Sequence, residues 1–240
     1  MLTKTEGIVL HSTRYSDFAS IVTIYTRQFG RNAYMVYGKG KKKSIYKPAF
    51  FQPFSIVELD VCHSPKKEIQ QIKDIKLSFL PQTLFFDPVK NSIALFLSEI
   101  LFKVLLQAET DEQLYSFLEN SIKILDTMEE GTSNFHLIFL LQLTRFLGFK
   151  PNSDNPSKTY FDLLNGTFLS RPPLHSHFLG PELTVDFILL LKSNYSTMAN
   201  VLLNHQKRKE LLENVLQYYQ LHISGLSNIQ SLEVLEEVFT

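Results

Sequence analysis

Apolar and polar residues alternate over several short runs in the first 80 residues, which is the pattern of half-buried β-strands. The expected strands cover residues 4–12, 19–29, 32–37, 50–62 and 69–77, with a polar turn at 13–17. Pro53 falls early in the fourth run and has no backbone N–H, so it indicates a sheet edge or a bulge there. The fifth run has less regular apolar spacing, which leaves a helix over part of it as an alternative.

A tight glycine turn at residues 28–31 joins the second and third strands and predicts a hairpin. Five short strands linked by turns favour a small closed barrel, because closure removes exposed strand edges. The pattern alone fits a five-stranded oligonucleotide/oligosaccharide-binding (OB) barrel and an SH3-like barrel equally well.

From Pro81 onward the apolar period changes to that of helices. Asp87 followed by Pro88 predicts a helix start, since Asp is a good N-cap and Pro fits the first turn. The expected helices cover about 88–107, 111–130 and 133–147, and helices fill most of the chain after 181, with a break near 224–225. Their apolar stripes are wide, so these helices are expected to pack on one another as a bundle.

Residues 149–180 interrupt the helical pattern with a loop and a short hairpin. Strand-like runs flank Asn165-Gly166, and this dipeptide suits the two positive-φ positions of a type I′ turn. The sequence therefore predicts an α+β multidomain protein. Its expected domains are an N-terminal barrel, residues 1–80, and an all-α helical domain with a small β-hairpin insertion, residues 81–240.

The formal net charge of the 240 residues is zero, but the two parts differ. Residues 1–80 hold thirteen Lys and Arg against six Asp and Glu, a net charge of +7, which leaves −7 for residues 81–240. A basic first part favours a polyanionic partner. Cys62 is the single cysteine, which fits a reducing cytoplasm. We expect no membrane association, because the start lacks an apolar signal region and the most apolar helical run, 93–106, is shorter than the ~20 residues of a span.

The stretch from Gly30 to Lys47 indicates that the polyanionic partner is a nucleic acid. A strand-like run ends at Gly38 and leads into a lysine-rich loop. The cations are Arg31, Lys39, Lys41, Lys42, Lys43 and Lys47, and the interleaved aromatic residues are Tyr34, Tyr37, Tyr46 and Phe50. Binding of single-stranded nucleic acid needs both types, cations for the phosphates and ring faces for the bases. The alternative is a protein-interaction scaffold in which the lysines are only solubilising charge.

Other chemistry has little support in the sequence. The run Gly38-Lys39-Gly40-Lys41 is not a phosphate-binding P-loop, because its glycines are not four residues apart and Pro48 follows where a helix should begin. No nucleophile–base signature is present, so a binding protein without catalysis is expected. One cysteine and no paired cysteines exclude the usual structural zinc sites, and the remaining candidate ligands are interpreted as loop residues. They are His136, Asp162, His175 and His177.

Short motifs along the chain occur in a characteristic order. In the first part they are Gly7–Leu10, Tyr15–Asp17, Thr23–Thr26, Phe29–Arg31, Gly38–Ser44 and Phe51–Phe54, and in the second part Ser98–Leu101 and Leu143–Pro151. Over nearly its full length the chain resembles the family of the bacterial recombination mediator RecO. Residues 6–54 carry the most specific part of the resemblance.

The resemblance implies an N-terminal OB barrel, a helical C-terminal domain, no cofactor and no catalysis. It also implies binding to single- and double-stranded DNA, annealing of complementary strands, and cooperation with RecR in loading RecA onto DNA coated by single-stranded-DNA-binding protein. Such a protein is cytoplasmic and associated with the nucleoid. The expected DNA-binding residues are Arg31, Tyr37, Lys39, Lys41, Lys42, Lys43 and Lys47.

This sequence departs from many members of that family in one respect. They carry four zinc-binding cysteines after the leucine-glycine-proline segment, whereas residues 152–180 hold none, so we expect no zinc. In the family, the acidic tail of single-stranded-DNA-binding protein docks on the helical domain. Lys207, Arg208 and Lys209 are the candidate cations for that docking, with a solvated helix start as the alternative.

Overall fold

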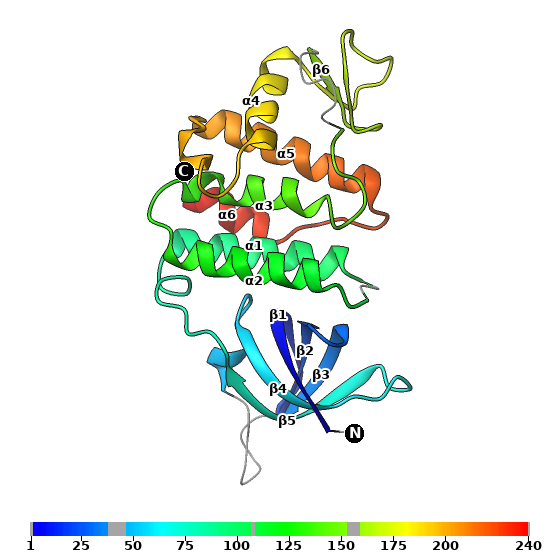
Figure 1. Cartoon of the computed structure of the whole chain (residues 1–240), viewed down its shortest axis with the longest axis vertical. Helices are drawn as coiled ribbons and strands as arrows, with labels where there is room; N and C mark the ends of the chain where they lie inside the picture. Colours follow the sequence, from blue (N-terminus) through cyan, green and yellow to red (C-terminus); the bar gives the residue numbers. More distant parts are fainter. Residues whose placement is uncertain (1, 38–46, 107–108, 153–158, 240) are drawn as a thin grey trace. The chain divides into compact units, whose positions relative to one another are not determined.

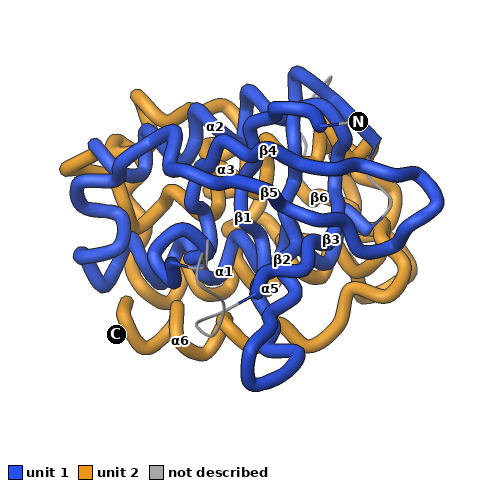
Figure 2. Tube along the Cα trace, turned by 90° about the horizontal axis from the view of Figure 1, so that it is seen from below, with its two compact units in different colours: residues 1–127 blue, residues 128–240 orange. Residues whose placement is uncertain are grey.

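The computed structural model describes residues 2–37, 47–106, 109–152 and 159–239. Two compact units divide the chain, residues 1–127 and residues 128–240 (Figure 2). The described residues of the first unit form a β-barrel, a short 3₁₀ helix and two α-helices, and those of the second form helices and a small sheet. The change from strands to helices falls near residue 80, as the sequence predicts, but the first compact unit extends beyond it. That residues 1–80 form a domain by themselves stays a prediction.

The first unit opens with a closed five-stranded barrel (Figure 1). Its strands are β1 (Leu2–Ser16), β2 (Ala19–Thr26), β3 (Gly30–Tyr37), β4 (Ile56–Cys62) and β5 (Ile69–Leu77). They follow the order β1-β2-β3-β5-β4, in which β3 and β5 pair in parallel and the other neighbours pair antiparallel. This confirms the OB barrel, the β2–β3 hairpin and the strand assignment of residues 69–77.

Two local predictions for the barrel are wrong. Residues 13–17 are not a polar turn, because β1 continues to Ser16 and a two-residue turn leads to Ala19. Pro53 does not lie in a strand, because β4 begins at Ile56 and a 3₁₀ helix, η1 (Pro48–Phe51), precedes it. The reason is burial: Phe51 belongs to the barrel core, and Phe54 adopts a positive φ of 66° with its N–H donated to Val9 O.

The interior of the barrel is filled by side chains from every strand and from η1. Alternate residues point inward, for example Val22 and Ile24 on β2, which is the period of a strand with one buried face. The buried cluster consists of Val9, Val22, Ile24, Tyr34, Val36, Phe51, Val57, Leu59, Val61, Ile72 and Ile75. The neighbouring positions on each strand therefore form the outer face of the barrel.

Two helices complete the first unit, α1 (Pro88–Val104) and α2 (Glu112–Thr127). Asp87 caps α1 as predicted, since its side chain accepts hydrogen bonds from the N–H groups of Val89 and Lys90. Asp111 caps α2 in the same way, through Gln113 N and Leu114 N. Figure 1 shows both helices on the same side of the barrel.

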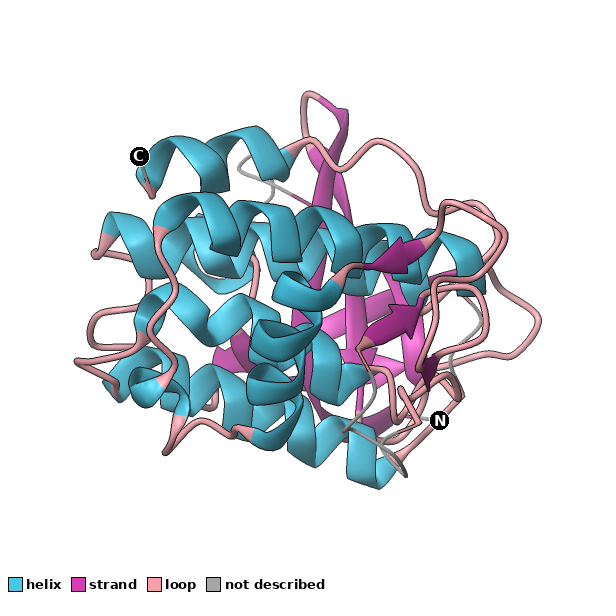
Figure 3. Ribbon diagram, turned by 90° about the horizontal axis from the view of Figure 1, so that it is seen from above, coloured by secondary structure: helices cyan, strands magenta, loops and turns pink. Residues whose placement is uncertain are grey.

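The second unit consists of helices and a three-stranded sheet, which Figure 3 distinguishes by colour. The helices are α3 (Phe135–Leu143), α4 (Pro181–Lys192), α5 (His205–His222) and α6 (Ser231–Val238), with 3₁₀ helices η2 (Thr132–Asn134) and η3 (Met198–Asn200). The strands are β6 (Tyr160–Asp162), β7 (Thr167–Leu169) and β8 (Phe178–Leu179). No helix among the described residues is long and apolar enough to cross a membrane.

The predicted hairpin at residues 160–170 is confirmed, but its type I′ turn is wrong. Asp162 pairs with Thr167, so four residues form the loop rather than two. Gly166 has a positive φ of 63°, whereas Asn165 does not. Asp162 explains the difference: its carboxylate accepts hydrogen bonds from Leu164 N, Asn165 N and Asn165 Nδ2, which stabilises the longer loop.

Candidate nucleic-acid interface

Strands β2 and β3 form the outer face that OB barrels use to bind oligonucleotides. Their outward positions form four cross-strand rows, because the core residues occupy the alternate positions. The rows are Tyr25 with Arg31, Thr23 with Ala33, Ile21 with Met35, and Ala19 with Tyr37. The two ends of this face have different surroundings, and that difference decides where a strand of DNA can lie.

The first row is covered by the helices of the same unit. Tyr25 is fully buried; its ring stacks on Tyr115 of α2 at 6.4 Å between centroids, and its hydroxyl donates to Glu109 O. Burial raises the pKa of Tyr25 to about 12. This end of the β2–β3 face is therefore a packing surface.

Arg27, in the β2–β3 turn, strengthens the same contact. Its guanidinium lies 2.9 Å from Glu119 and 3.2 Å from Glu6, measured between the nearest nitrogen and oxygen atoms. The guanidinium carbon is also 4.4 Å from the centroid of the Tyr115 ring. One positive charge of the basic first part is thus used to hold α2 against the barrel.

Arg31 was predicted to contact DNA, and the structure places it under α1. Its Nη1 donates a hydrogen bond of 3.1 Å to Leu106 O, and its guanidinium carbon lies 4.9 Å from the centre of the Phe102 ring. Burial lowers the pKa of Arg31 from its usual value. The guanidinium is engaged with the helical cover, at the end of the face opposite Tyr37.

In the last row of the face, Tyr37 is exposed whereas its partner Ala19 is buried. Tyr37 ends β3 with a side chain that is 49% exposed. Of the other aromatic residues singled out in the sequence, Tyr34 is fully buried in the core, and Phe50 is half-buried beside Lys47, whose Nζ is 5.1 Å from the ring centroid. The exposed end of the face is therefore the one from which the chain continues into the lysine-rich segment. Tyr46 and the predicted contacts Lys39, Lys41, Lys42 and Lys43 lie outside the described residues.

The structure adds two aromatic residues that the sequence analysis missed. Tyr15 and Phe18 are 67% and 65% exposed at the tip of the β1–β2 hairpin. Ser16 pairs with Ala19, and Ala19 pairs with Tyr37, so the tip lies next to the open end of the face. Two aromatic residues within and just before a short turn, between two strand-like runs, are the signal that would have indicated them.

Other cations of the barrel are partly neutralised. Lys4 and Lys76 both pair with Glu58, at 2.7 and 3.1 Å, and their hydrogen bonds lower the pKa of Glu58. Among the described residues of the barrel, the cations without an ion pair include Lys47, Lys66, Lys67 and Lys73. Positive charge that is available for phosphates is therefore not evenly spread over the barrel.

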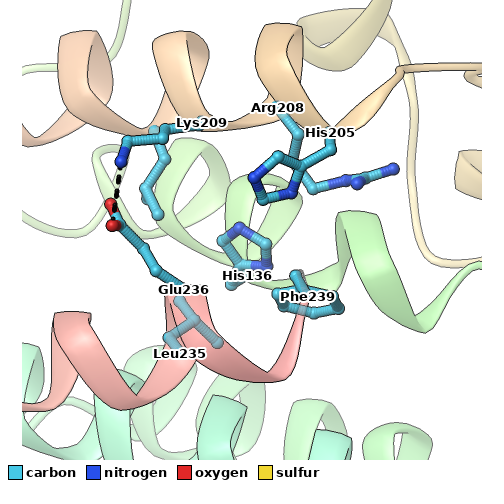
Figure 4. A pocket seen from close by; sticks show the side chains of 8 residues that line it. His136, His205, Arg208, Lys209, Leu235, Glu236 and Phe239 are labelled. Atoms are coloured by element: carbon cyan, nitrogen blue, oxygen red, sulfur yellow. Dashed lines mark hydrogen bonds and ion pairs between the residues drawn. The ribbon is translucent and has the colours of Figure 1, made fainter.

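The second unit contains a small pocket between α5 and α6 (Figure 4). Its lining residues are His136, His205, Arg208, Lys209, Leu212, Leu235, Glu236 and Phe239. Lys209 of α5 pairs with Glu236 of α6 at 3.0 Å, while Arg208 donates to Leu203 O and Asn134 Oδ1. The third candidate cation, Lys207, pairs with Asp186 at 2.8 Å. Burial, followed by the charge of Arg208, lowers the pKa of His136 to about 3, so this histidine is neutral.

The candidate metal ligands Asp162, His175 and His177 do not converge on one point in the described part of residues 149–180. His175 Nε2 is 3.4 Å from Asp162 Oδ1, but His177 Nδ1 is directed to Gln217 Nε2. Within the described parts of the chain, no group of three or more His, Cys, Asp or Glu side chains could hold a metal ion. Asp162 instead stabilises its own loop.

Comparisons with known proteins cover the whole chain. The family model described as Recombination protein O N terminal matches residues 1–80, and the one described as Recombination protein O C terminal matches residues 86–231. The chain is 40% identical over 241 residues to the DNA repair protein RecO of Phocaeicola vulgatus and 39% identical over 240 residues to that of Azobacteroides pseudotrichonymphae. It is 33% identical over 242 residues to that of Flavobacterium psychrophilum. Each comparison covers 100% of this chain and 100% of the relative.

Proposed function

Because this chain belongs to the RecO family of DNA repair and recombination proteins, we propose that it binds single- and double-stranded DNA and anneals complementary strands. Together with RecR it helps to load RecA onto DNA that is coated by single-stranded-DNA-binding protein. It acts in the cytoplasm at the nucleoid, and it contributes binding and positioning rather than a catalytic step.

The end of strand β3 is the observation that supports DNA binding best. β3 ends at the exposed Tyr37, and the sequence then continues through Lys39 and Lys41–Lys43 to Lys47. Lysines bind phosphates as point charges and carry no base code. Binding is therefore expected to depend strongly on salt and weakly on DNA sequence.

Strand annealing follows from the same charge. Two complementary strands repel each other through their phosphates, and a cationic surface reduces that repulsion. Because phosphate contacts leave the base edges free, the bound strands remain able to pair. No covalent chemistry is required for this step.

The triple substitution of Lys41, Lys42 and Lys43 by alanine tests the proposed role of the lysine segment. Each phosphate contact on single-stranded DNA contributes about 0.7 to the slope of log affinity against log salt, so the slope should fall by about 2 in the triple variant. Fluorescence anisotropy with a labelled single-stranded oligonucleotide at several salt concentrations measures this slope.

A matched control removes three positive charges from another part of the barrel. Lys66, Lys67 and Lys73 are exposed and have no ion pair among the described residues. Their triple alanine variant should change the slope by less than 1. An unchanged slope in the Lys41–Lys43 variant would exclude the role given to that segment, and absence of binding by the wild-type protein at low salt would favour the scaffold function.

The pocket between α5 and α6 supports the proposed interaction with single-stranded-DNA-binding protein. An acidic tail requires cations beside an apolar surface, and the pocket combines Arg208 and Lys209 with Leu212 and Leu235. Glu236 already pairs with Lys209, so an incoming carboxylate would compete with it. Charge changes on the two partners of this ion pair should therefore act in opposite directions.

Replacement of Lys209 by alanine should weaken binding of a labelled peptide from the acidic tail about fivefold, whereas replacement of Glu236 by glutamine should strengthen it about threefold. Fluorescence anisotropy of the peptide measures both effects. If the two substitutions change the affinity in the same direction, the tail does not bind at this pocket.

A further inference from the structure

The tip of the β1–β2 hairpin carries two aromatic residues that are unusually exposed to solvent. Residues 11–16 of β1 are all exposed, and the strand continues to a two-residue turn, Asp17-Phe18. Tyr15 and Phe18 leave about two thirds of their side chains accessible. Packing within the first unit does not explain rings that are exposed to this extent.

The backbone at this tip directs Tyr15 away from the regular ladder. Arg14 pairs with Ser20 and Ser16 pairs with Ala19, so Tyr15 is the extra residue of a β-bulge. Bulges change the direction of a side chain and occur often beside functional sites. The inserted residue is thus placed outside the pattern that fills the barrel.

The tip is also held in a defined shape. Arg14 Nη2 donates to Asp17 Oδ1 at 2.6 Å, and Ser16 Oγ accepts from Phe18 N at 3.3 Å. The Arg14–Asp17 ion pair neutralises the charge of the turn. The rings of Tyr15 and Phe18 are therefore presented by a pre-ordered turn that brings little net charge.

From these observations we propose that Tyr15, Phe18 and Tyr37 form a stacking platform for the unpaired bases of single-stranded DNA. The proposal rests on the proposed DNA-binding function and adds to it a contact with the bases. The exposed Tyr37 pairs with Ala19, which pairs with Ser16 of the hairpin tip, whereas α1 and α2 contact the other end of the same face. The lysines that follow Tyr37 in the sequence supply the phosphate attraction that a neutral tip lacks.

Single-stranded DNA fits this arrangement better than a protein partner. Ring faces bind any base by stacking, and the lysines that follow Tyr37 in the sequence are expected to bind the phosphates of the same strand. Bases in a duplex are already stacked on their neighbours, so the rings are not expected to add to duplex binding. The platform thus makes the protein prefer unpaired strands, which are the substrate of annealing.

The test compares a thymidine oligonucleotide with an abasic oligonucleotide of equal length and charge. The wild-type protein should bind the thymidine strand more tightly, by about tenfold for each ring that stacks. The double variant Tyr15→Ala with Phe18→Ala keeps Tyr37 as the one ring of the platform, so its preference should fall about a hundredfold, to about tenfold. Its salt slope should stay the same, because stacking releases no counterions. Phe86, which is 80% exposed before α1, provides the matched control: Phe86→Ala should bind both strands as the wild type does.

The outcomes separate this proposal from the proposed function. If the wild-type protein binds the thymidine and abasic strands equally well, the stacking platform is wrong while DNA binding through phosphates stands. If it binds neither strand at low salt, DNA binding itself is wrong. The comparison of the two strands uses the wild-type protein, so it decides the question even if the double variant does not fold. A folded double variant with unchanged preference would overturn the platform and leave the rings to a protein partner.

Discussion

Replacing Asp126 by alanine is expected to lower the free energy of unfolding by about 3 kcal/mol. The Asp126 side chain is almost fully buried near the end of α2, where it accepts hydrogen bonds from the N–H groups of Gln82, Thr83 and Leu84. These residues belong to the segment that leads from the barrel to α1. The substitution leaves three N–H groups without their acceptor, and urea unfolding followed by circular dichroism measures the loss.

Lys90 makes the loss larger. It is a buried lysine of α1 whose Nζ donates to Thr83 Oγ1 and to Asp126 O, both at 2.8 Å. Without the Asp126 carboxylate, the Lys90 charge loses a compensating charge. Asp126→Asn is the matched control, because it keeps the size and one acceptor oxygen, and it should lose about half as much. Equal stability of the alanine variant and the wild type would contradict this account.

The contribution of Asp126 should also depend on pH. Burial opposes ionisation of the carboxyl, but the hydrogen bonds from Gln82, Leu84 and Thr83, with the charge of Lys90, bring its pKa below the ordinary value of 3.8. The unfolded chain therefore takes up this proton first as the pH falls. The difference in stability between the wild type and Asp126→Asn should be constant above about pH 5 and shrink below pH 3.8.

Replacing Gly7 by alanine is expected to destabilise the barrel by about 2 kcal/mol. Gly7 of β1 pairs with Thr26 on one side and Val57 on the other. A Cβ atom at this position would lie 2.5 Å from Ile24 Cγ2 and 3.2 Å from Thr26 Cγ2, which is too close for the core to remain unchanged. The loss therefore comes from overpacking, and urea unfolding measures it.

Overpacking predicts that a second substitution relieves the first. Leucine has a single γ-carbon, so Ile24→Leu removes a methyl group next to position 7 and by itself should cost less than about 1.5 kcal/mol. The double variant Gly7→Ala with Ile24→Leu should be more stable than the sum of the two single losses by about 1 kcal/mol. Losses that simply add would show that the contact between these positions is not the cause.

Helices α1 and α2 explain why the basic residues of positions 1–80 do not all lie on an accessible basic surface. Arg27 and Arg31 contribute to the charge surplus of residues 1–80, yet both face the helices of their own unit. Lys4 and Lys76 share Glu58 on another face of the barrel. The proposed DNA-binding surface therefore depends on the lysines around and after β3 and on the open end of the β2–β3 face.

The sequence by itself determined the type and order of the elements. Alternation over two residues marked the strands of the barrel, the change of period at Pro81 marked the helices, and Asp87 marked the start of α1. These signals are local, because the alternation of a strand and the cap of a helix each involve residues close together in the chain. The resemblance of the motifs also identified the family to which the comparisons assign the chain.

The tertiary structure alone decided which side chains remain accessible. Tyr34 and Tyr37 are three residues apart in one strand, but one is in the barrel core and the other is at the open end of the face. The structure also changes which residues are candidates for DNA contacts. Arg31 was an expected contact but packs against α1, whereas Tyr15 was not expected and is exposed at a β-bulge. The burial of Tyr34 and the contacts of Arg31 depend on packing between segments far apart in the sequence, which a local pattern of residues does not record.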